Sequence, residues 1–246
     1  MNKQLIPNVS VDSIVFGFDS VHLKVLLIGR DVVYKGVQYN DWKLPGDLIR
    51  CDESLDTASK HILKDLTGLQ NIYMKQLKTF GAVDRLTRRP RDMSWLIGIN
   101  HPEERVITIP YYSLINLSNG TDSNLNITSN ARWFNVDDVS ALPMAFDHRE
   151  IFEFALKTLR DELRTKPLAF ELLPLKFSLS ELQKIYEIII GISLDRRNFR
   201  KKIPNLSYIV PLNEKEISVS HRPAKLYMFS RDIYQKLKKE KFDFSI

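Results

Sequence analysis

The stretch KLPGDLIRCDESLDTASKHILKDLTGL, residues 43–69, decides the fold of the first part of this chain. It begins with a Pro-Gly turn. From Ser54 onward its apolar residues recur at spacings of three and four, which predicts an amphipathic α-helix. Gly68 stands where such a helix ends, because glycine readily takes the left-handed conformation of a helix C-terminus. The stretch therefore predicts a loop and a helix with one face packed into a core.

Length and composition limit the class of protein. The chain has 246 residues, which is enough for one large or two modest domains. Its residues are 43% hydrophobic and 27% charged, as in soluble globular proteins. No run of about 20 apolar residues suggests a membrane span, and residues 1–12 lack the apolar core of a signal peptide. The single cysteine, Cys51, excludes an internal disulfide framework. We expect a cytoplasmic protein without a membrane partner.

The charge is unevenly distributed along the chain. Residues 166–246 contain 16 Lys and Arg against nine Asp and Glu, a net charge of +7, whereas residues 1–165 carry a net charge of −1. This asymmetry predicts two domains with different partners, and a polyanion as partner of the second. A basic tail that only keeps the protein soluble is the alternative that charge alone leaves open.

Residues 1–165 read as strands with two helices. The turn DSVH at 19–22 separates two strands and predicts a β-hairpin. The expected strands are 9–18, 23–30, 71–83, 104–116 and 131–139, the expected helices are 54–66 and 146–165, and 40–47 is expected to be a loop. Because strands and helices do not alternate regularly, the fold class is α+β with a mixed sheet.

Residues 166–246 have a different pattern. Residues 178–191 predict a helix that opens with a capping box of Ser178 and Glu181. A second helix, 193–203, follows at once, with Ser193 as its expected N-cap. Two helices joined by so short a turn indicate a helix-turn-helix. Strands expected at 206–212 and 217–229, joined by the turn NEKE, form a hairpin, so that the order is that of a winged helix.

The opening stretch resembles the Nudix box, Gly-x5-Glu-x7-Arg-Glu-U-x-Glu-Glu-x-Gly-U, in which U is aliphatic. Its end, TGL, aligns with the end of the motif. Four residues then match the pattern: Glu53, Leu63, Gly68 and Leu69. Asp65 takes one late acidic position, and LPGD at 44–47 stands where the family has Leu-Pro-Gly-Gly. The resemblance implies a Nudix-fold domain.

The departures from the motif affect catalysis. Asp47 replaces a glycine and His61 replaces the arginine, while Ile62 and Leu66 replace two of the three helix glutamates. In the family those glutamates bind Mg²⁺, which neutralises the diphosphate being hydrolysed. Aliphatic side chains supply no oxygen ligand, and their simplest role is core packing. We therefore expect no catalytic residues, no metal site, no cofactor and no enzymatic activity.

The resemblance extends from about Val9 to Phe229. It is to the Nudix-related transcriptional regulators, in which a Nudix effector domain precedes a winged helix-turn-helix, usually in a homodimer. The run DRRNFRKK at 195–202 is its most specific element. The resemblance implies a Nudix-like domain at 1–165 and a winged helix-turn-helix domain at 166–246. It also implies a ligand-responsive regulator that binds a double-stranded DNA operator as a homodimer.

The second helix of the helix-turn-helix is the expected recognition helix. Arg and Asn at its start can read guanine and adenine edges, so Arg196, Arg197 and Asn198 are assigned to base or groove contacts. The phosphate contacts, which fix register, are assigned to Arg200, Lys201 and Lys202. In the wing, His221, Arg222 and Lys225 are expected near a flanking backbone or minor groove. Asp195 is expected to be a helix N-terminal acid or an ion-pair partner.

The effector is expected to bind the first domain. Aromatic, Asp and Arg residues suit a sugar, and an acidic Asp47 at the usual diphosphate position favours a neutral ligand. The candidate effector residues are Lys43, Asp47, Arg91, Asp92, Trp95 and Arg105. A sugar such as arabinose, sensed by the branch of the family with degenerate Nudix boxes, is the main expectation, with sugar catabolism as the regulated process.

Two alternatives remain. Some family members sense ADP-ribose or related NAD metabolites, and the arginines could equally bind a nucleotide phosphate. A Nudix pyrophosphohydrolase with an accessory domain is the second alternative, and the missing carboxylates argue against it. The helix-turn-helix-hairpin order argues against an RNA-binding or purely structural role for the basic domain.

Overall fold

The structure is a computed structural model that describes residues 4–87, 92, 105–117, 130–217 and 223–239. The chain divides into two compact units. Unit 1 comprises residues 1–19 and 23–156, and unit 2 comprises residues 20–22 and 157–246. None of the helices among the described residues has the length and apolar character that crossing a membrane requires. The point of separation expected after residue 165 stays a prediction.

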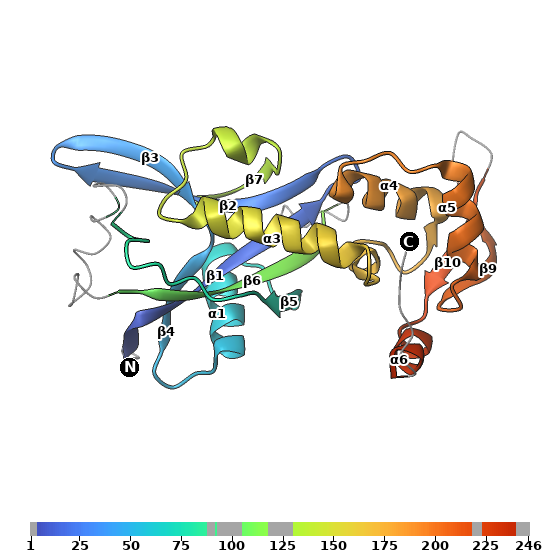
Figure 1. Cartoon of the computed structure of the whole chain (residues 1–246), viewed down its shortest axis with the longest axis horizontal. Helices are drawn as coiled ribbons and strands as arrows, with labels where there is room; N and C mark the ends of the chain where they lie inside the picture. The colour runs from blue at the N-terminus through green and yellow to red at the C-terminus, as the bar shows by residue number, and fades with distance from the viewer. Residues whose placement is uncertain (1–3, 88–91, 93–104, 118–129, 218–222, 240–246) are drawn as a thin grey trace. The chain divides into compact units, whose positions relative to one another are not determined.

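Unit 1 is built on a mixed seven-stranded sheet, drawn in blue and green in Figure 1. Its main path runs β3-β2-β1-β6-β5, with β4 paired to β1 and β7 to β2. The strands are β1 (Leu5–Phe18), β2 (Leu23–Tyr34), β3 (Val37–Lys43), β4 (Gly46–Arg50), β5 (Tyr73–Gln76), β6 (Ile107–Asn116) and β7 (Ala131–Asn135). Strands β1 and β6 are parallel and the other pairs are antiparallel. The predicted α+β class with a mixed sheet is confirmed.

A helix covers each face of this sheet (Figure 1). Helix α1 (Leu55–Thr67) packs on one face, where Val11 and Val15 of β1 lie in clusters with its buried residues. Helix α3 (His148–Leu163) lies on the other, where the ring centroid of Phe152 is 6.2 Å from that of Phe16. Alternate residues of β1 thus serve opposite faces, as the two-residue period of a strand requires.

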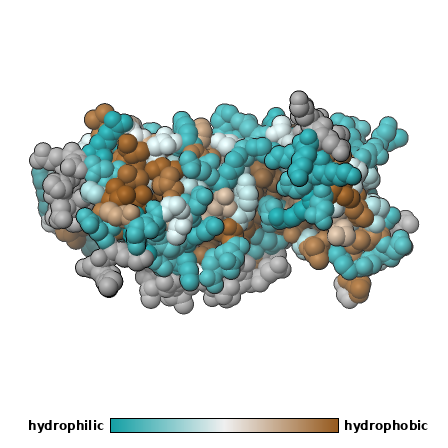
Figure 2. All heavy atoms as spheres, turned by 90° about the horizontal axis from the view of Figure 1, so that it is seen from below, coloured by the Kyte–Doolittle hydropathy of each residue, from teal (hydrophilic) through white to brown (hydrophobic). Residues whose placement is uncertain are grey.

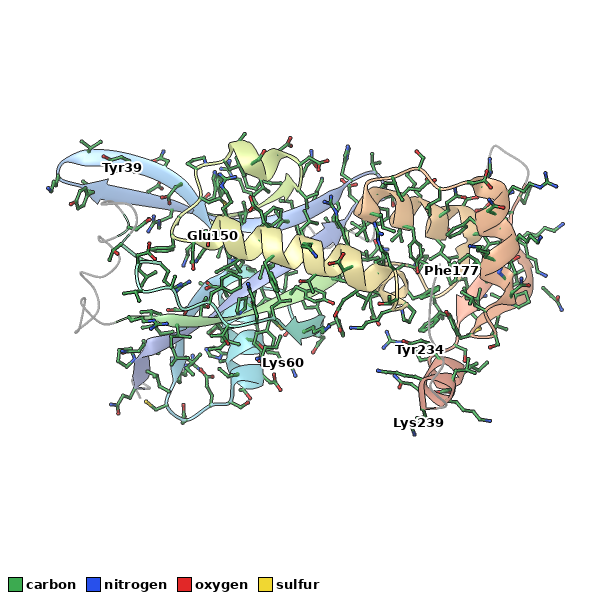
Figure 3. The ribbon with its side chains drawn as sticks, viewed as in Figure 1. Tyr39, Lys60, Glu150, Phe177, Tyr234 and Lys239 are labelled. Atoms are coloured by element: carbon green, nitrogen blue, oxygen red, sulfur yellow. The ribbon has the colours of Figure 1, made fainter. Side chains whose placement is uncertain are left out.

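Helix α1 begins and ends as predicted. Ser54 caps its N-terminus by accepting a hydrogen bond from the backbone N of Thr57. Gly68 ends it with a φ of 79°, in the left-handed region. Lys60 lies on the side of the helix away from the sheet (Figure 3).

Strands β3 and β4 were not predicted from the sequence. Residues 40–47, expected as a loop, contain the end of β3 and the start of β4. Conversely, the strand expected at 71–83 is limited to β5, and the strand expected at 131–139 ends at Asn135, before the 3-10 turn Asp138–Ala141. Strand β4 pairs with β1, which is distant in sequence, so no local pattern reports its partner. Strand β3 forms a hairpin with β2, in which Tyr34 pairs with Val37, and its turn at Lys35 and Gly36 was a local signal that the prediction did not use.

Unit 2 contains helices α4 (Leu179–Ile190), α5 (Arg196–Lys202) and α6 (Arg231–Lys239). A three-stranded sheet of order β8-β10-β9 completes it, with β8 (Phe177–Ser178), β9 (Ile209–Lys215) and β10 (Lys225–Phe229). Short 3-10 turns lie at Leu168–Glu171 and Ile203–Asn205. The order helix, turn, helix, hairpin confirms the predicted winged helix.

The helix ends of unit 2 match the prediction for α4 and differ from it for α5. The capping box of Ser178 and Glu181 forms in full, and Gly191 ends α4 with a φ of 79°. The N-cap of α5 is Asp195 rather than Ser193, because the Asp195 carboxylate accepts from the Asn198 backbone N at 2.7 Å. The turn expected at NEKE lies largely inside β9. Residues 218–222 are outside the described part.

Aromatic side chains form the core of unit 2. Phe177 is buried (Figure 3), and its ring centroid lies 5.5 Å from that of Phe170. Phe170 also stacks on Phe229 with ring centroids 4.3 Å apart, and Tyr186 meets Phe199 edge-on at 6.0 Å. These contacts hold the start of β8, the end of β10 and the inner face of α5 in one core.

The surface of unit 1 is not uniformly polar. Figure 2 shows hydrophobic residues gathered on the part of the molecule that unit 1 forms. The exposed hydrophobic side chains of this unit include Leu5, Val83 and Ile107.

Candidate functional site

The two aliphatic replacements in the Nudix box lie in the core of unit 1. Ile62 is 3% exposed and belongs to a cluster with Val11 and Ile109. Leu66 is half-buried and packs against the same cluster. The positions that would hold metal-binding glutamates therefore face apolar side chains, and the predicted packing role of both residues is confirmed.

The remaining acids of the box contact residues of the chain itself. Glu53 Oε2 lies 2.7 Å from His61 Nδ1, and Glu53 Oε1 accepts from the Arg50 backbone N at 2.8 Å. Asp65 is exposed, with a carboxylate oxygen 3.8 Å from Arg50 Nη2. Among the described residues, no group of three or more His, Cys, Asp or Glu side chains is placed to hold a metal ion.

A small polar cavity of about 30 Å³ lies beside the start of α3. Its lining combines acidic, basic and apolar side chains from β1, the end of β3, the start of β4, the 85–86 turn and the start of α3. The lining residues are Ser10, Asp12, Lys43, Gly46, Asp47, Arg85, Leu86, Val106, Phe146 and His148. We call it the polar cavity.

Asp12 is the most deeply placed acid of the polar cavity. It is 5% exposed, and burial raises the pKa of its carboxyl against the opposing effect of Arg85. Its Oδ2 accepts a hydrogen bond of 2.6 Å from Thr108 Oγ1. Lys43, on the same cavity, has a pKa lowered by burial, and Asp12 and Asp47 act in the opposite direction. The cavity therefore holds opposite charges that burial makes costly unless they are paired.

His148, the first residue of α3, is neutral in this environment. Its Nδ1 accepts from the Leu44 backbone N at 2.9 Å, so its ring proton is on Nε2, which lies 3.6 Å from Asp12 Oδ1. Burial lowers its pKa to about 3. One imidazole thus connects the link between β3 and β4, strand β1 and the start of α3.

Arg85, which also lines the polar cavity, forms two parallel hydrogen bonds with Asp147. Its Nε and Nη2 each donate to the Asp147 carboxylate at 2.9 Å, and Nη2 lies 3.8 Å from Asp12 Oδ2. Bidentate geometry makes this pair strong and specific in orientation. Asp147 and His148 both belong to the start of α3, which is therefore fixed to the polar cavity by two neighbouring residues.

The glycine of the LPGD turn is required by a close approach. A Cβ added to Gly46 would lie 2.7 Å from the carbonyl O of Val11, where backbone cannot give way easily. A larger residue would displace the start of β4, which carries Asp47, from β1.

The predicted effector residues are only partly brought together. Lys43 and Asp47 line the polar cavity. Asp92 is buried outside its lining, where it accepts from Arg30 Nη2 at 2.8 Å and from the Phe146 backbone N at 3.3 Å. Arg105 is exposed and donates to the carbonyl O of Gly81. Arg91 and Trp95 lie outside the described residues.

Three residues of the polar cavity were missed in the sequence: Asp12, Arg85 and His148. Asp12 could have been recognised from the sequence, because an aspartate within the apolar strand VSVDSIVFGF is an unusual buried charge. No comparable local signal marks Arg85, whose partner Asp147 is 62 residues away.

Helix α5 carries the predicted DNA-binding residues of the helix-turn-helix. Phe199 faces the core, and the six polar positions assigned to DNA are all exposed: Arg196, Arg197, Asn198, Arg200, Lys201 and Lys202. Lys225 is exposed at the start of β10, and His221 and Arg222 lie outside the described residues. The structure therefore leaves the α5 residues available to a ligand.

Comparison with known proteins finds relatives of this two-domain arrangement. Residues 169–229 match the family model of the NrtR DNA-binding winged helix domain. The ADPR responsive transcriptional repressor NtrR of Acinetobacter baylyi is 29% identical over 230 residues, which cover 93% of this chain and 84% of the relative.

Solved structures of similar architecture cover nearly the whole chain. The structure of Shewanella oneidensis NrtR complexed with a 27mer DNA has a TM-score of 0.74 and 26% identity, covering 96% of this chain and 97% of that one. Shewanella oneidensis NrtR alone has a TM-score of 0.69 and 27% identity, covering 91% and 94%. A MutT/nudix family protein from Enterococcus faecalis, with a TM-score of 0.63, 24% identity and coverage of 92% and 88%, shares the fold.

The sheet with α1 carrying a Nudix-box remnant, the winged helix that follows it, and these similarities agree on one family. Along both domains the chain is similar to the NrtR-type regulators, in which a Nudix domain is followed by a DNA-binding winged helix domain.

Proposed function

We propose that this chain is a transcriptional repressor that binds operator DNA through α5 and changes its DNA affinity when ADP-ribose binds unit 1. The observation that carries the proposal is its similarity along both domains, over 93% of the chain, to a repressor described as ADPR responsive. The similarity over 96% of the chain to an NrtR crystallised with a 27mer DNA supports the DNA-binding part.

ADP-ribose takes the place of the sugar that the sequence led us to expect as effector. The A. baylyi relative is described as ADPR responsive, which favours ADP-ribose over a sugar. The charge of Asp47 does not require a neutral ligand, because Asp47 shares the polar cavity with Lys43, which offsets that charge.

The polar cavity is the proposed anchor for part of the effector. Its volume of about 30 Å³ admits one group of a nucleotide rather than the whole ligand. Lys43 supplies positive charge for a phosphate, and the Asp12 carboxylate can accept from ribose hydroxyls. Lys43 and Asp47 are therefore proposed effector residues, joined by Asp12 and His148.

Helix α3 is the proposed connector between effector and DNA. It starts at His148, which lines the polar cavity, and its residues after Leu156 belong to unit 2. A ligand that favours one arrangement of the α3 start changes the DNA-binding unit only if it binds that arrangement more tightly. The coupling is expected to be reciprocal, so DNA must change effector affinity by the same factor.

The test is a titration of a fluorescent operator duplex with the full chain, with and without ADP-ribose, NAD and arabinose. ADP-ribose is expected to change the DNA affinity by roughly 5- to 150-fold, and arabinose is expected to leave it unchanged. Lys43→Met, which keeps the buried bulk and removes the charge, should bind DNA and lose the response.

Arg197→Ala is the matched control for the effector domain, since it should lose specific DNA binding and retain ADP-ribose binding in calorimetry. If arabinose changes the DNA affinity and ADP-ribose does not, the sugar hypothesis is restored. If no duplex is bound specifically, the repressor proposal is wrong.

A further inference from the structure

The exposed residues of α5 do not all face the same way. Phe199 is 4% exposed and anchors the inner face of the helix. With 3.6 residues per turn, Arg197 and Lys201, each two positions from Phe199, point away from the core. Arg196 and Arg200 lie one turn apart on the flank between these two directions. These two arginines therefore share one flank of α5, whereas Asn198, one position before Phe199, lies on the opposite flank.

The flank of Arg196 and Arg200 borders two adjoining grooves, of about 550 Å³ and about 530 Å³. Helix α4, helix α5 and the residues at the start of β10 contribute most of their walls. Four residues line both grooves: Ser180, Arg196, Arg200 and Ala224. We call the two together the basic groove, to which Lys225 contributes on one side and Lys184 on the other.

The acids of the basic groove are committed to local hydrogen bonds. Glu181 accepts from the Ser178 backbone N at 2.7 Å in the capping box, and Glu216 accepts from the Ala224 backbone N at 3.0 Å. Arg200 Nη2 donates to Ser180 Oγ at 3.1 Å, which holds the guanidinium across the groove toward the first turn of α4. Four cationic side chains thus converge on a groove with two acids, which favours an extended anion.

We propose that the basic groove carries the phosphate backbone of one DNA strand, held by Arg196, Arg200 and Lys225, and that base reading is confined to Arg197, Asn198 and Lys201. The proposal rests on the proposed DNA-binding function. Phosphate contacts fix register and base contacts carry sequence information. It reverses two assignments made from the sequence, because Arg196 moves from bases to phosphates and Lys201 moves from phosphates to bases.

The physical reason for the reversal is the inner face of α5. Phe199 fixes the rotation of a helix of only seven residues, so that the Cα–Cβ bond of each residue leaves the helix in one direction. Arg196 precedes Arg197 by one residue yet points about 100° away from it. Sequence order alone does not separate the two arginines.

The experiment measures the salt dependence of binding for two duplexes. One is selected from a randomised pool by the wild-type chain, and the other is its scrambled version. Arg196→Ala and Arg200→Ala are expected to weaken binding to both duplexes by the same factor and to reduce the slope of log affinity against log salt by about one each. Arg197→Ala is expected to reduce the preference for the selected duplex by roughly 5- to 150-fold.

Lys236→Ala is the matched control, because it removes the same charge from α6, which does not line the basic groove and ends at Lys239 (Figure 3). Its salt slope should equal that of wild type. Thermal unfolding of each variant should match wild type, since all four side chains are exposed.

The proposal is overturned if Arg196→Ala changes the sequence preference at an unchanged salt slope, or if Lys236→Ala reduces the slope as much as Arg196→Ala does. Wild-type chain that does not distinguish the two duplexes would instead overturn the proposed function itself.

Discussion

His148 shows how burial sets the protonation of a single residue. Its imidazole accepts from the Leu44 backbone N and has a pKa lowered to about 3 by burial, whereas in an unfolded chain its pKa is about 6.5. Between these two values the unfolded chain binds a proton that the folded chain does not. The stability of unit 1 that depends on neutral His148 is therefore present above about pH 6.5 and is lost as the pH falls toward 3.

We expect His148→Gln to remove this part of the pH dependence, because a glutamine oxygen can still accept from Leu44 and does not titrate. Between pH 7 and pH 5, wild type should lose about 2 kcal/mol of unfolding free energy more than the variant. Tryptophan fluorescence during urea unfolding reports on unit 1, since all three tryptophans precede residue 157.

The difference in unfolding free energy between wild type and His148→Gln reports the titration of His148 alone. The raised pKa of Asp12 acts in the opposite direction, because it favours the folded state as the pH falls, and Asp12 is present in both proteins. Arg85, Lys43, Arg30 and Asp147 also face the imidazole and are unchanged. An equal loss of stability in both proteins would contradict a buried neutral histidine.

Ile62 and Leu66 lead to a prediction about catalysis. Both side chains pack in an apolar cluster at positions where metal-binding glutamates would stand, and Mg²⁺ requires oxygen ligands. We expect the chain to release no AMP from ADP-ribose above buffer background, with or without Mg²⁺. Chromatography of the products measures this, and a Mg²⁺-dependent turnover abolished by Glu53→Gln would show that the prediction is wrong.

At the scale of elements, two side chains of α4 hold the turn that leads into α5. Glu187 Oε1 accepts from the Leu194 backbone N at 2.8 Å, and Gln183 Nε2 donates to the Leu194 carbonyl O at 3.1 Å. Gln183 Nε2 also donates to Glu187 Oε1 at 2.9 Å. Both peptide groups of Leu194 are thus fixed two residues before α5 begins, which sets the direction of the proposed recognition helix.

We expect Glu187→Ala to destabilise unit 2 by about 1–3 kcal/mol, because the Leu194 N–H loses its partner, and to weaken binding to a selected operator duplex. Glu187→Gln keeps a carbonyl acceptor and should restore both properties. Thermal unfolding and fluorescence anisotropy measure them. If the glutamine variant binds DNA as weakly as the alanine variant, the charge of Glu187 matters rather than its hydrogen bonds.

At the scale of the whole molecule, each chain contributes a single winged helix. Two copies of α5 on neighbouring turns of one duplex would be about 34 Å apart, which matches a site with two-fold symmetry. We therefore predict that the chain binds its operator as a homodimer. Analytical ultracentrifugation of the complex should give two chains per duplex, and footprinting should give two half-sites. A monomer at binding concentrations, or a single protected half-site, would contradict this prediction.

The sequence by itself determined helices α1, α3, α4 and α5, the fold class and the resemblance to the family, but not helix α6. Helix α4 begins at the capping box of Ser178 and Glu181 and ends at Gly191, and helix α1 ends at Gly68. Signals of this kind can be read from a short window, because the groups that satisfy a helix terminus are its sequence neighbours. The replacement of two Nudix-box glutamates by Ile62 and Leu66 was equally visible.

Only the tertiary structure decided where the charges of unit 1 meet and which way α5 faces. Asp12, Arg85 and His148 come from distant parts of the chain and converge on the polar cavity, and strand β4 pairs with β1, which is remote in sequence. Burial decides the protonation of His148, and the packing of Phe199 decides the directions of Arg196 and Arg197. Strand pairing, desolvation and packing depend on residues that fold together from far apart, so no local pattern contains them.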